Sequence, residues 1–376
     1  MAISLQSLDL FREAILFGLF SCIFAFIWAP FLTKVLYKYK IVRNPEYDAT
    51  LAMGARQSKA GVPIMGGLLV ILTVALITIL FNWERKFTWV PIGVMGTAAL
   101  LGGVDDILNI YGHKRRNRKI SQILTLIRVH KDFKQRVWLL LTLPWALFKR
   151  TSMWLGSHPG KGLHVHERIL LQLLVGAVTA WWIYFKLGEQ WRFIHIPFDG
   201  MINIGIWIIP LIILFVFLTA NAVNIADGMD GLAGGSLIIT FVALTLLSWI
   251  AGLPEITLLN ATTVGALITY TYFNIKPARF QMGDVGSLGL GALLAINTIV
   301  INRMILLPLL GFIFFVELGS VLLQVLSRYL LGKRIFKMAP LHHHFEMRGW
   351  SEEKTVMRFW IIHAGFVLLG VWIALY

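Results

Sequence analysis

Long apolar runs separated by shorter polar segments dominate the pattern of the chain. A helix that crosses a bilayer needs about 20 mostly apolar residues. The pattern predicts about ten such helices and therefore an all-α integral membrane protein. The ten predicted helices cover residues 14–33, 65–82, 88–104, 168–186, 203–222, 232–251, 256–273, 285–301, 304–330 and 356–375.

Composition agrees with this prediction. Of the 376 residues, 57% are hydrophobic and only 14% are charged, whereas an ordinary soluble domain carries about 25% charged residues. These values exclude a typical soluble enzyme and a disordered chain. We interpret residues 1–376 as a single polytopic domain. The single cysteine, Cys22, excludes a disulfide framework or a cysteine-based metal site within one chain.

The basic residues predict the orientation. The net charge is +15, which favours a membrane surface or an anionic substrate as partner and makes nucleic acid the least favoured one. All but six of the 34 Lys and Arg lie on or beside the loops 34–64, 105–167, 223–231, 274–284 and 331–355. The positive-inside rule makes these loops cytoplasmic and both termini periplasmic. We interpret the first apolar run as a retained span rather than a signal peptide.

One cytoplasmic segment is unusually long. With Arg168 at its edge, the loop 105–167 holds 13 Lys and Arg. Within it, the apolar run 138–148 is interrupted by Pro144 and is too short to span. We expect 113–160 to be a basic insertion whose segment near 138–148 lies at the inner leaflet. The alternative is a solvated linker.

Acidic residues are scarce and concentrated. Five of the 19 lie at the cytoplasmic ends of predicted spans. One such Asp would be a helix cap, but five from three separate loops indicate a functional site at the cytoplasmic face, because ionisable groups at membrane borders are costly. The five are Asp105, Asp106, Asp227, Asp230 and Asp284.

The surroundings of these residues suggest phosphate chemistry. If 219–235 is helical, Asn224, Asp227 and Asp230 share one side of the helix. Asp284 begins a predicted helix, where a carboxylate can hold Mg²⁺ together with substrate phosphates. The consecutive side chains of His342, His343 and His344 diverge and lack further ligands with zinc-site spacing. Binding of a diphosphate or a sugar is the favoured interpretation, and the whole set predicts phosphoryl transfer.

The segments 221–231, 274–287 and 340–346 resemble the signatures of the phospho-N-acetylmuramoyl-pentapeptide-transferase family. The resemblance covers about 59–112 and 161–376. It implies ten spans, a bacterial inner (cytoplasmic) membrane and a homodimer. The implied reaction joins UDP-N-acetylmuramoyl-pentapeptide to undecaprenyl phosphate with Mg²⁺, and gives lipid I and UMP. This is the first membrane step of peptidoglycan synthesis, on which cell shape and division depend.

Site residues follow from the resemblance position by position. Asp284 matches the Mg²⁺ ligand, with Asp105 and Asp230 as further candidate ligands. Asp105 and Asp106 match an adjacent catalytic pair, in which Asp105 is the candidate base, and His343 belongs to the same catalytic set. The implied substrate-binding residues are Lys59, Arg168, Asn224, Asp227, Asp230, Asn274, Ser287, Gln324, His342 and His344.

Three features depart from the family pattern. Val62 and Ile64 stand where the family usually has threonines on both sides of a proline. Arg168 replaces a lysine and so keeps the charge with a different geometry. The insertion 113–160 has no counterpart, and we hypothesise that it docks on the inner leaflet or on a partner protein.

The sequence leaves alternatives open for both the mechanism and the function. Direct attack by the lipid phosphate is the default mechanism, and a covalent aspartyl-phosphate on Asp105 or Asp106 is the alternative. A sister transferase that uses UDP-N-acetylglucosamine is the nearest rival function. An ion-coupled transporter is more remote, because transporters bind near the bilayer midplane and Glu317 is the main carboxylate within a predicted span.

Overall fold

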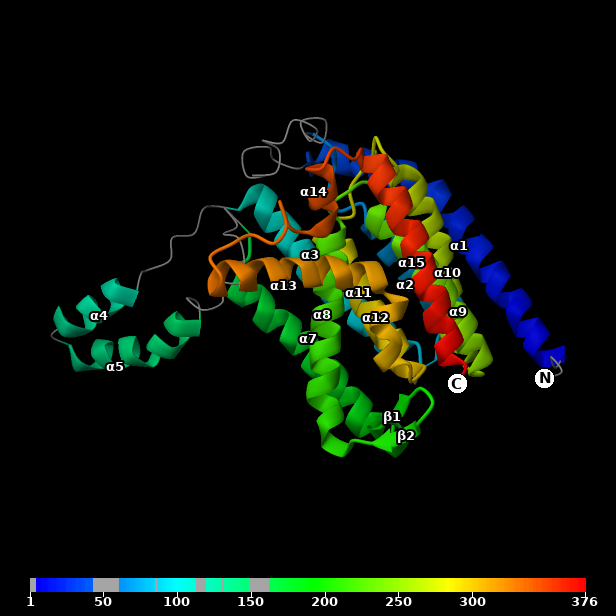
Figure 1. Cartoon of the computed structure of the whole chain (residues 1–376), viewed down its shortest axis with the longest axis horizontal. Coiled ribbons are helices and arrows are strands. Elements are labelled where there is room, and N and C mark those ends of the chain that lie inside the picture. Colours follow the sequence, from blue (N-terminus) through cyan, green and yellow to red (C-terminus); the bar gives the residue numbers. More distant parts are fainter. Residues whose placement is uncertain (1–4, 43–60, 85–86, 113–119, 130–131, 149–161) are drawn as a thin grey trace.

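The computed structural model describes residues 5–42, 61–84, 87–112, 120–129, 132–148 and 162–376, and these are mostly helical (Figure 1). Eight of the described helices are long and apolar enough to cross a membrane. The prediction of an all-α membrane protein is therefore confirmed at this level. The helices are α1 (Leu5–Lys38), α2 (Leu68–Phe81), α3 (Trp89–Tyr111), α4 (Ile120–Val129), α5 (Phe133–Leu141), α7 (Val165–Lys186), α8 (Ile208–Ala226), α9 (Leu232–Ile250), α10 (Pro254–Asn274), α11 (Gly283–Val300), α12 (Leu307–Leu310), α13 (Phe312–Leu330), α14 (Leu341–Glu346) and α15 (Glu352–Ala374).

Each of the ten predicted ranges contains a helix. Two of these helices fall outside the set of eight. Helix α2 has only 14 residues, and α10, although 21 residues long, carries Asn260 and five threonines that lower its hydropathy. Short 3-10 turns (Glu189–Arg192, Gly205–Trp207 and Met304–Leu306) and an antiparallel hairpin of β1 (Phe193–Ile196) and β2 (Gly200–Asn203) complete the regular elements of the described residues.

The sequence predicted one continuous helix over 304–330, but the structure divides this range. A 3-10 turn leads into α12, which contains Pro308, and the chain bends at Gly311 before α13 begins. In Figure 1, α13 runs across the direction of the neighbouring helices. An apolar run does not reveal such a bend, because both of its parts are equally hydrophobic.

Helix α11 forms the centre of the molecule. Every residue from Leu288 to Val300 is buried, and α3, α8 and α2 pack around it. Glycines allow the closest approaches, since the missing side chain lets two backbones meet. A Cβ atom at Gly102 of α3 would overlap the carbonyl oxygen of Asp284, and one at Gly67 would overlap Gly286. The close packing therefore brings the last turns of α3 against the start of α11.

Gly102→Ala tests this packing. Overpacked cores lose about 1–3 kcal/mol, so we expect a lower thermal unfolding temperature and lower activity, because the added methyl group pushes α3 away from Asp284. Gly96→Ala on the same helix is the matched control, since a Cβ atom there meets no neighbouring atom within 4 Å. Equal unfolding temperatures for both variants, measured in detergent, would contradict the close approach.

The described residues of five loops meet at one end of the bundle, which we call the site face. They are the loops 34–64, 105–167, 223–231, 274–284 and 331–355, the same set that carries most of the basic residues. Helix α14 lies at this end in Figure 1. Three hydrogen bonds join the loops in pairs: Gln281 N–H to Pro63 O, Gly283 N–H to Asp227 Oδ2, and Asp230 N–H to Glu352 Oε1. A fourth, from Leu163 N–H to Asp105 Oδ1, joins the two ends of the loop 105–167.

The remaining connections meet at the opposite end. There Arg303 Nε donates to the carbonyl of Ala374, near the end of α15, and Trp249 Nε1 donates to the carbonyl of Ser7, near the start of α1. Figure 1 places the N and C labels at this end. The loops thus alternate between two ends, as the distribution of basic residues predicts.

Candidate active site

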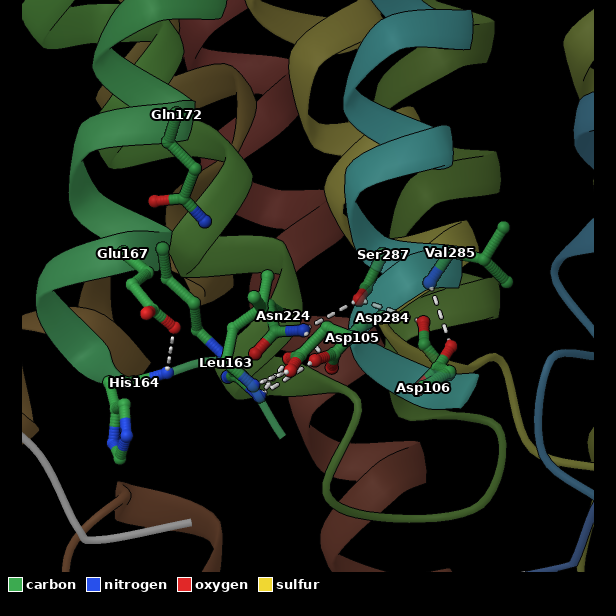
Figure 2. A network of polar contacts seen from close by, with 12 residues as sticks. Asp105, Asp106, Leu163, His164, Glu167, Gln172, Asn224, Asp284, Val285 and Ser287 are labelled. Atoms are coloured by element: carbon green, nitrogen blue, oxygen red, sulfur yellow. Dashed lines mark hydrogen bonds and ion pairs between the residues drawn. The ribbon is translucent and has the colours of Figure 1, made fainter. Parts of the chain in front are cut away.

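Three carboxylates converge on the site face. Asp105 and Asp106 lie on the last turns of α3, and Asp284 lies on the first turn of α11 (Figure 2). Asp106 Oδ2 accepts a hydrogen bond from Val285 N–H at 3.0 Å, and the carboxyl groups of Asp105 and Asp284 both lie beside the guanidinium of Arg168. Asp105 and Asp106 are 1% and 5% exposed. Carboxylates at such low exposure, next to the partly exposed Asp284, require nearby cations or hydrogen-bond donors.

Arg168 supplies one cation. It lies on the first turn of α7, forms an ion pair with Asp105, and places Nη2 3.3 Å from Asp284 Oδ2. Asp105 Oδ1 also accepts from Leu163 N–H at 2.7 Å, just before α7. The guanidinium therefore bridges carboxylates from α3 and α11. Since one positive charge faces three carboxylates, the cluster keeps an affinity for a further cation.

Asn224 fixes the orientation of Asp284. Its Nδ2 donates to Asp284 Oδ1 at 2.7 Å and to Ser287 Oγ at 2.8 Å. The Ser287 hydroxyl in turn donates to Gly283 O at 2.9 Å. The structure thus brings together Asn224, Ser287 and Asp284, three residues that the sequence had assigned to the site.

The assumption that 219–235 is helical throughout was wrong. Helix α8 ends at Ala226, turns follow, and Gly231 takes a left-handed conformation with φ +84° before α9 begins. The three polar side chains therefore do not share one helical face. Asn224 contacts Asp284, Asp227 accepts from Gly283 N–H at 3.2 Å, and Asp230 lies in a separate cluster.

The second cluster organises the loops behind the carboxylates. Asp230 Oδ2 accepts from Ala278 N–H at 3.3 Å, and its own N–H donates to Glu352 Oε1 at 3.0 Å. Asn274 Oδ1 accepts from Gly231 N–H at 2.9 Å, while its Nδ2 donates to Phe280 O. Sequence reasoning missed Glu352, because an acidic residue in the first turn of a helix is common and gave no sign of this contact.

The histidines form a third cluster, which contains a carboxylate that the sequence left unassigned. The buried Glu317 of α13 accepts from His342 N–H at 3.1 Å and lies 3.0 Å from His342 Nδ1. His342 Nε2 lies 3.2 Å from His343 Nε2, and His343 Nδ1 lies 3.0 Å from Glu346 Oε2. The result is a hydrogen-bonded chain from Glu317 through two imidazoles to Glu346.

Neighbouring groups fix the orientation of both imidazoles, because each ring nitrogen of His342 and His343 has a hydrogen-bond partner within this chain. A Cβ atom at Gly228 would overlap His342 Nε2, so this pair lies directly beside the residue that follows Asp227.

His344 has a different environment. Its Nδ1 accepts from Lys337 N–H at 3.1 Å, so this nitrogen carries no proton. Burial lowers the pKa of its imidazole below the ordinary value, and the charges of Arg348 and Lys337 lower it further. His344 is therefore neutral near pH 7, with Nε2 as the donor. Only two of the three predicted histidines share one hydrogen-bonded chain.

The predicted site also includes Gln324 and Lys59. Gln324 Oε1 accepts from the N–H groups of Ile335 and Phe336 at 3.1 and 3.0 Å, and its Nε2 donates to Phe336 O. It holds the loop that precedes the histidines. Lys59 lies outside the described residues, so its predicted role stays a prediction.

The donor set of the first cluster suits a shared Mg²⁺ site. Among the described residues, the His, Cys, Asp and Glu side chains form no group of three or more that could hold a metal alone. Mg²⁺ commonly binds through one or two carboxylates plus substrate phosphates and water. Asp284 and Asp105, which share the guanidinium of Arg168, fit that pattern, whereas Asp230, the third candidate ligand, is hydrogen-bonded within the second cluster.

A small apolar cavity lies between α3, α7, α8 and α11, next to the carboxylates. Its nearest lining residues stand one helical turn from the polar residues on the same helices, as Leu101 does from Asp105. The carboxylate cluster therefore borders an apolar region, and charge interactions are stronger there than in water. The cavity is lined by Ala98, Leu101, Gln172, Val175, Val216, Ala220, Leu288 and Ala292.

Glu317→Gln tests the histidine chain. The amide keeps the shape but has only one acceptor atom, so it cannot accept both from His342 N–H and from Nδ1–H. Because partners that orient a histidine commonly contribute about 10- to 100-fold to activity, we expect turnover to fall by about 10-fold or more. Glu189→Gln, on an exposed residue at the opposite end, is the control. Unchanged turnover in Glu317→Gln would contradict the positioning role.

Several known proteins are similar to this chain in sequence. The profile of Glycosyl transferase family 4 matches residues 159–302. The proteins named phospho-N-acetylmuramoyl-pentapeptide-transferase from Chloroflexus aurantiacus and Leptospira biflexa are both 34% identical, over 330 and 369 residues. The alignments cover 84% and 93% of this chain and 78% and 90% of those relatives.

A third relative of the same name, from Levilactobacillus brevis, is 34% identical over 326 residues, with 85% of this chain and 86% of the relative covered. The chain belongs to the phospho-N-acetylmuramoyl-pentapeptide-transferase family.

Proposed function

We propose that the protein transfers phospho-N-acetylmuramoyl-pentapeptide from its UDP derivative to undecaprenyl phosphate, and so makes lipid I and UMP. Relatives of that name over most of the chain support this reaction. The observation that carries the proposal is the convergence of Asp105, Asp106 and Asp284 with Arg168 at one end of the helical bundle. Phosphoryl transfer depends mainly on positioning and charge neutralisation.

In the proposed mechanism, an oxygen of the lipid phosphate attacks the sugar-proximal phosphorus of the UDP substrate, and the bond to the UMP oxygen breaks. Asp105 removes a proton from the lipid phosphate. Arg168, which already bridges Asp105 and Asp284, holds this pair in register and faces phosphate oxygens through its guanidinium. Asn224 keeps Asp284 oriented.

Asp284 would hold Mg²⁺ together with substrate phosphates, beside Asp105 as the base. When bound, the ion neutralises charge on the diphosphate and stabilises the leaving UMP. The imidazoles of His342 and His343 would bind the diphosphate or the sugar from the side of Gly228. His344 and Gln324 support the same loop through backbone contacts.

We also propose the arrangement in the membrane. Ten helices cross it, the site face is cytoplasmic, and both chain ends lie on the periplasmic side of a bacterial inner membrane. The joint grouping of basic loops and acidic clusters at one end supports this orientation. On the family resemblance alone, we propose a homodimer. A transporter is not favoured, because these carboxylates lie at helix ends rather than in the middle of the bundle.

Release of UMP distinguishes the two possible mechanisms. In a direct attack, enzyme mixed with UDP-N-acetylmuramoyl-pentapeptide and Mg²⁺ releases UMP only after undecaprenyl phosphate is added. A covalent aspartyl-phosphate would release one UMP per active site in the absence of the lipid. We expect no such burst in rapid-quench measurements, and a stoichiometric burst would contradict the direct mechanism.

A further inference from the structure

The insertion between α3 and α7 contains a helical hairpin that extends away from the bundle (Figure 1). Leu139 of α5 and Ala146 of the helix 143–148 form a small core, against which Leu126 and Ile127 of α4 pack. This core holds α4 and the following helices together. The hairpin connects the end of α3 with the start of α7, so it emerges from the site face.

One stripe of α5 exposes large apolar side chains. At about 100° per residue, Phe133, Val137, Leu140 and Leu141 share one side of the helix, while the buried Leu139 points toward α4. Phe133 is 77% exposed and Leu141 is 73% exposed. Such a stripe is unfavourable in water, because the exposure of large apolar side chains to water costs free energy.

Positive charge borders the same stripe. Lys134 and Arg136 flank it on the helix and are both exposed. Over 113–161 the sequence contains 12 Lys and Arg and a single acidic residue, Asp132. An apolar helical face with cationic edges and an exposed Trp138, 62% exposed, is the combination that favours the interface of an anionic bilayer.

The hairpin is also attached to the helix that bears Arg168. The ring centroids of Trp145 and His166 lie 5.3 Å apart, and those of Phe148 and His166 lie 6.5 Å apart. His166 is buried on the first turn of α7, two residues before Arg168. The hairpin is therefore fixed to the first turn of a membrane-length helix at the level of the site face.

We propose that the hairpin lies on the cytoplasmic leaflet, with the stripe Phe133–Val137–Leu140–Leu141 inserted among anionic lipids and Lys134 and Arg136 at their headgroups. The occupant of the stripe is the lipid surface rather than a second protein. The excess of 12 basic residues over one acidic residue in 113–161 supports an anionic partner, and the attachment to α7 keeps the hairpin within reach of the membrane in which the chain is embedded.

Site-directed labels in the full-length protein test this proposal. In a Cys22→Ser background, a nitroxide is attached at Leu141→Cys, in the stripe, and at the matched exposed position Gln135→Cys, which lies about 170° around α5 from the middle of the stripe. The proteins are reconstituted in nanodiscs of phosphatidylcholine with or without phosphatidylglycerol. Accessibility to oxygen and to a water-soluble nickel complex is then measured by electron paramagnetic resonance.

We expect the label at position 141 to favour oxygen and the label at 135 to favour the nickel complex. Phosphatidylglycerol should strengthen the difference, and the double substitution Lys134→Gln and Arg136→Gln should weaken it several-fold. Nickel accessibility at both positions would show a solvated linker, and poor accessibility to both reagents at 141 would show a protein contact. Either result, or a difference that phosphatidylglycerol does not change, would overturn the proposal. Transferase activity of each labelled protein serves as the check of folding.

Discussion

Asp284→Asn is expected to lower turnover by at least about 10³-fold. Electrostatic stabilisation by a bound metal is worth several kcal/mol, and each 1.36 kcal/mol corresponds to tenfold in rate. Asparagine keeps the shape of the side chain, so Asn224 and Ser287 retain their places, but the negative charge that would hold Mg²⁺ is lost. The measurement is steady-state UMP release over a series of Mg²⁺ concentrations.

The same variant should bind the UDP substrate more weakly in the presence of Mg²⁺, because the ion would link the carboxylate to the diphosphate. Asp199→Asn is the matched control, since Asp199 is an exposed carboxylate in the turn between β1 and β2. A normal rate for Asp284→Asn at ordinary Mg²⁺ concentrations would show that the carboxylate cluster around α11 is not the reaction centre.

Asp105→Asn is expected to have a comparably large effect of a different kind. General bases contribute about 10²–10⁴-fold, so kcat should fall by that factor while binding of the UDP substrate stays largely intact. The amide oxygen can still accept from Leu163 N–H, which preserves the loop before α7. The amide nitrogen, however, cannot pair with the guanidinium of Arg168.

Calorimetric titration with the UDP substrate, together with kcat, separates binding from chemistry in this variant. A decrease confined to substrate affinity, with unchanged kcat, would contradict the role of Asp105 as a base. Thermal unfolding of the variant beside the wild-type protein reports whether the loss of the Arg168 pair has loosened α3 and α7. These two readouts keep a structural effect distinguishable from a chemical one.

The sequence predicted the helices well because each membrane-length run carries its own signal. Each predicted range contains a helix, although 304–330 is divided at Gly311, and the contacts at the two ends of the bundle follow the alternation of basic loops. Asp105, Asp106 and Asp284 could be grouped in advance, because acidic residues are scarce in an apolar chain and these three share one predicted side of the membrane.

Other features depend on long-range contacts that no local pattern contains. Glu317 lies within an apolar run, and nothing in its neighbourhood reveals that it accepts two hydrogen bonds from His342, 25 residues further on. The bend at Gly311 and the end of α8 at Ala226 were missed for a related reason. A hydrophobic run indicates that its residues are buried or face lipid, but it does not show where the helix ends or changes direction.

The most direct test of the proposed function compares two donors under identical conditions. Purified protein receives undecaprenyl phosphate and Mg²⁺ with either UDP-N-acetylmuramoyl-pentapeptide or UDP-N-acetylglucosamine, and UMP release is measured for each. We expect rapid UMP release and a lipid-linked diphosphate product with the muramoyl-pentapeptide donor, and little release with the other. Preferential turnover of UDP-N-acetylglucosamine, or no UMP from either donor, would contradict the account.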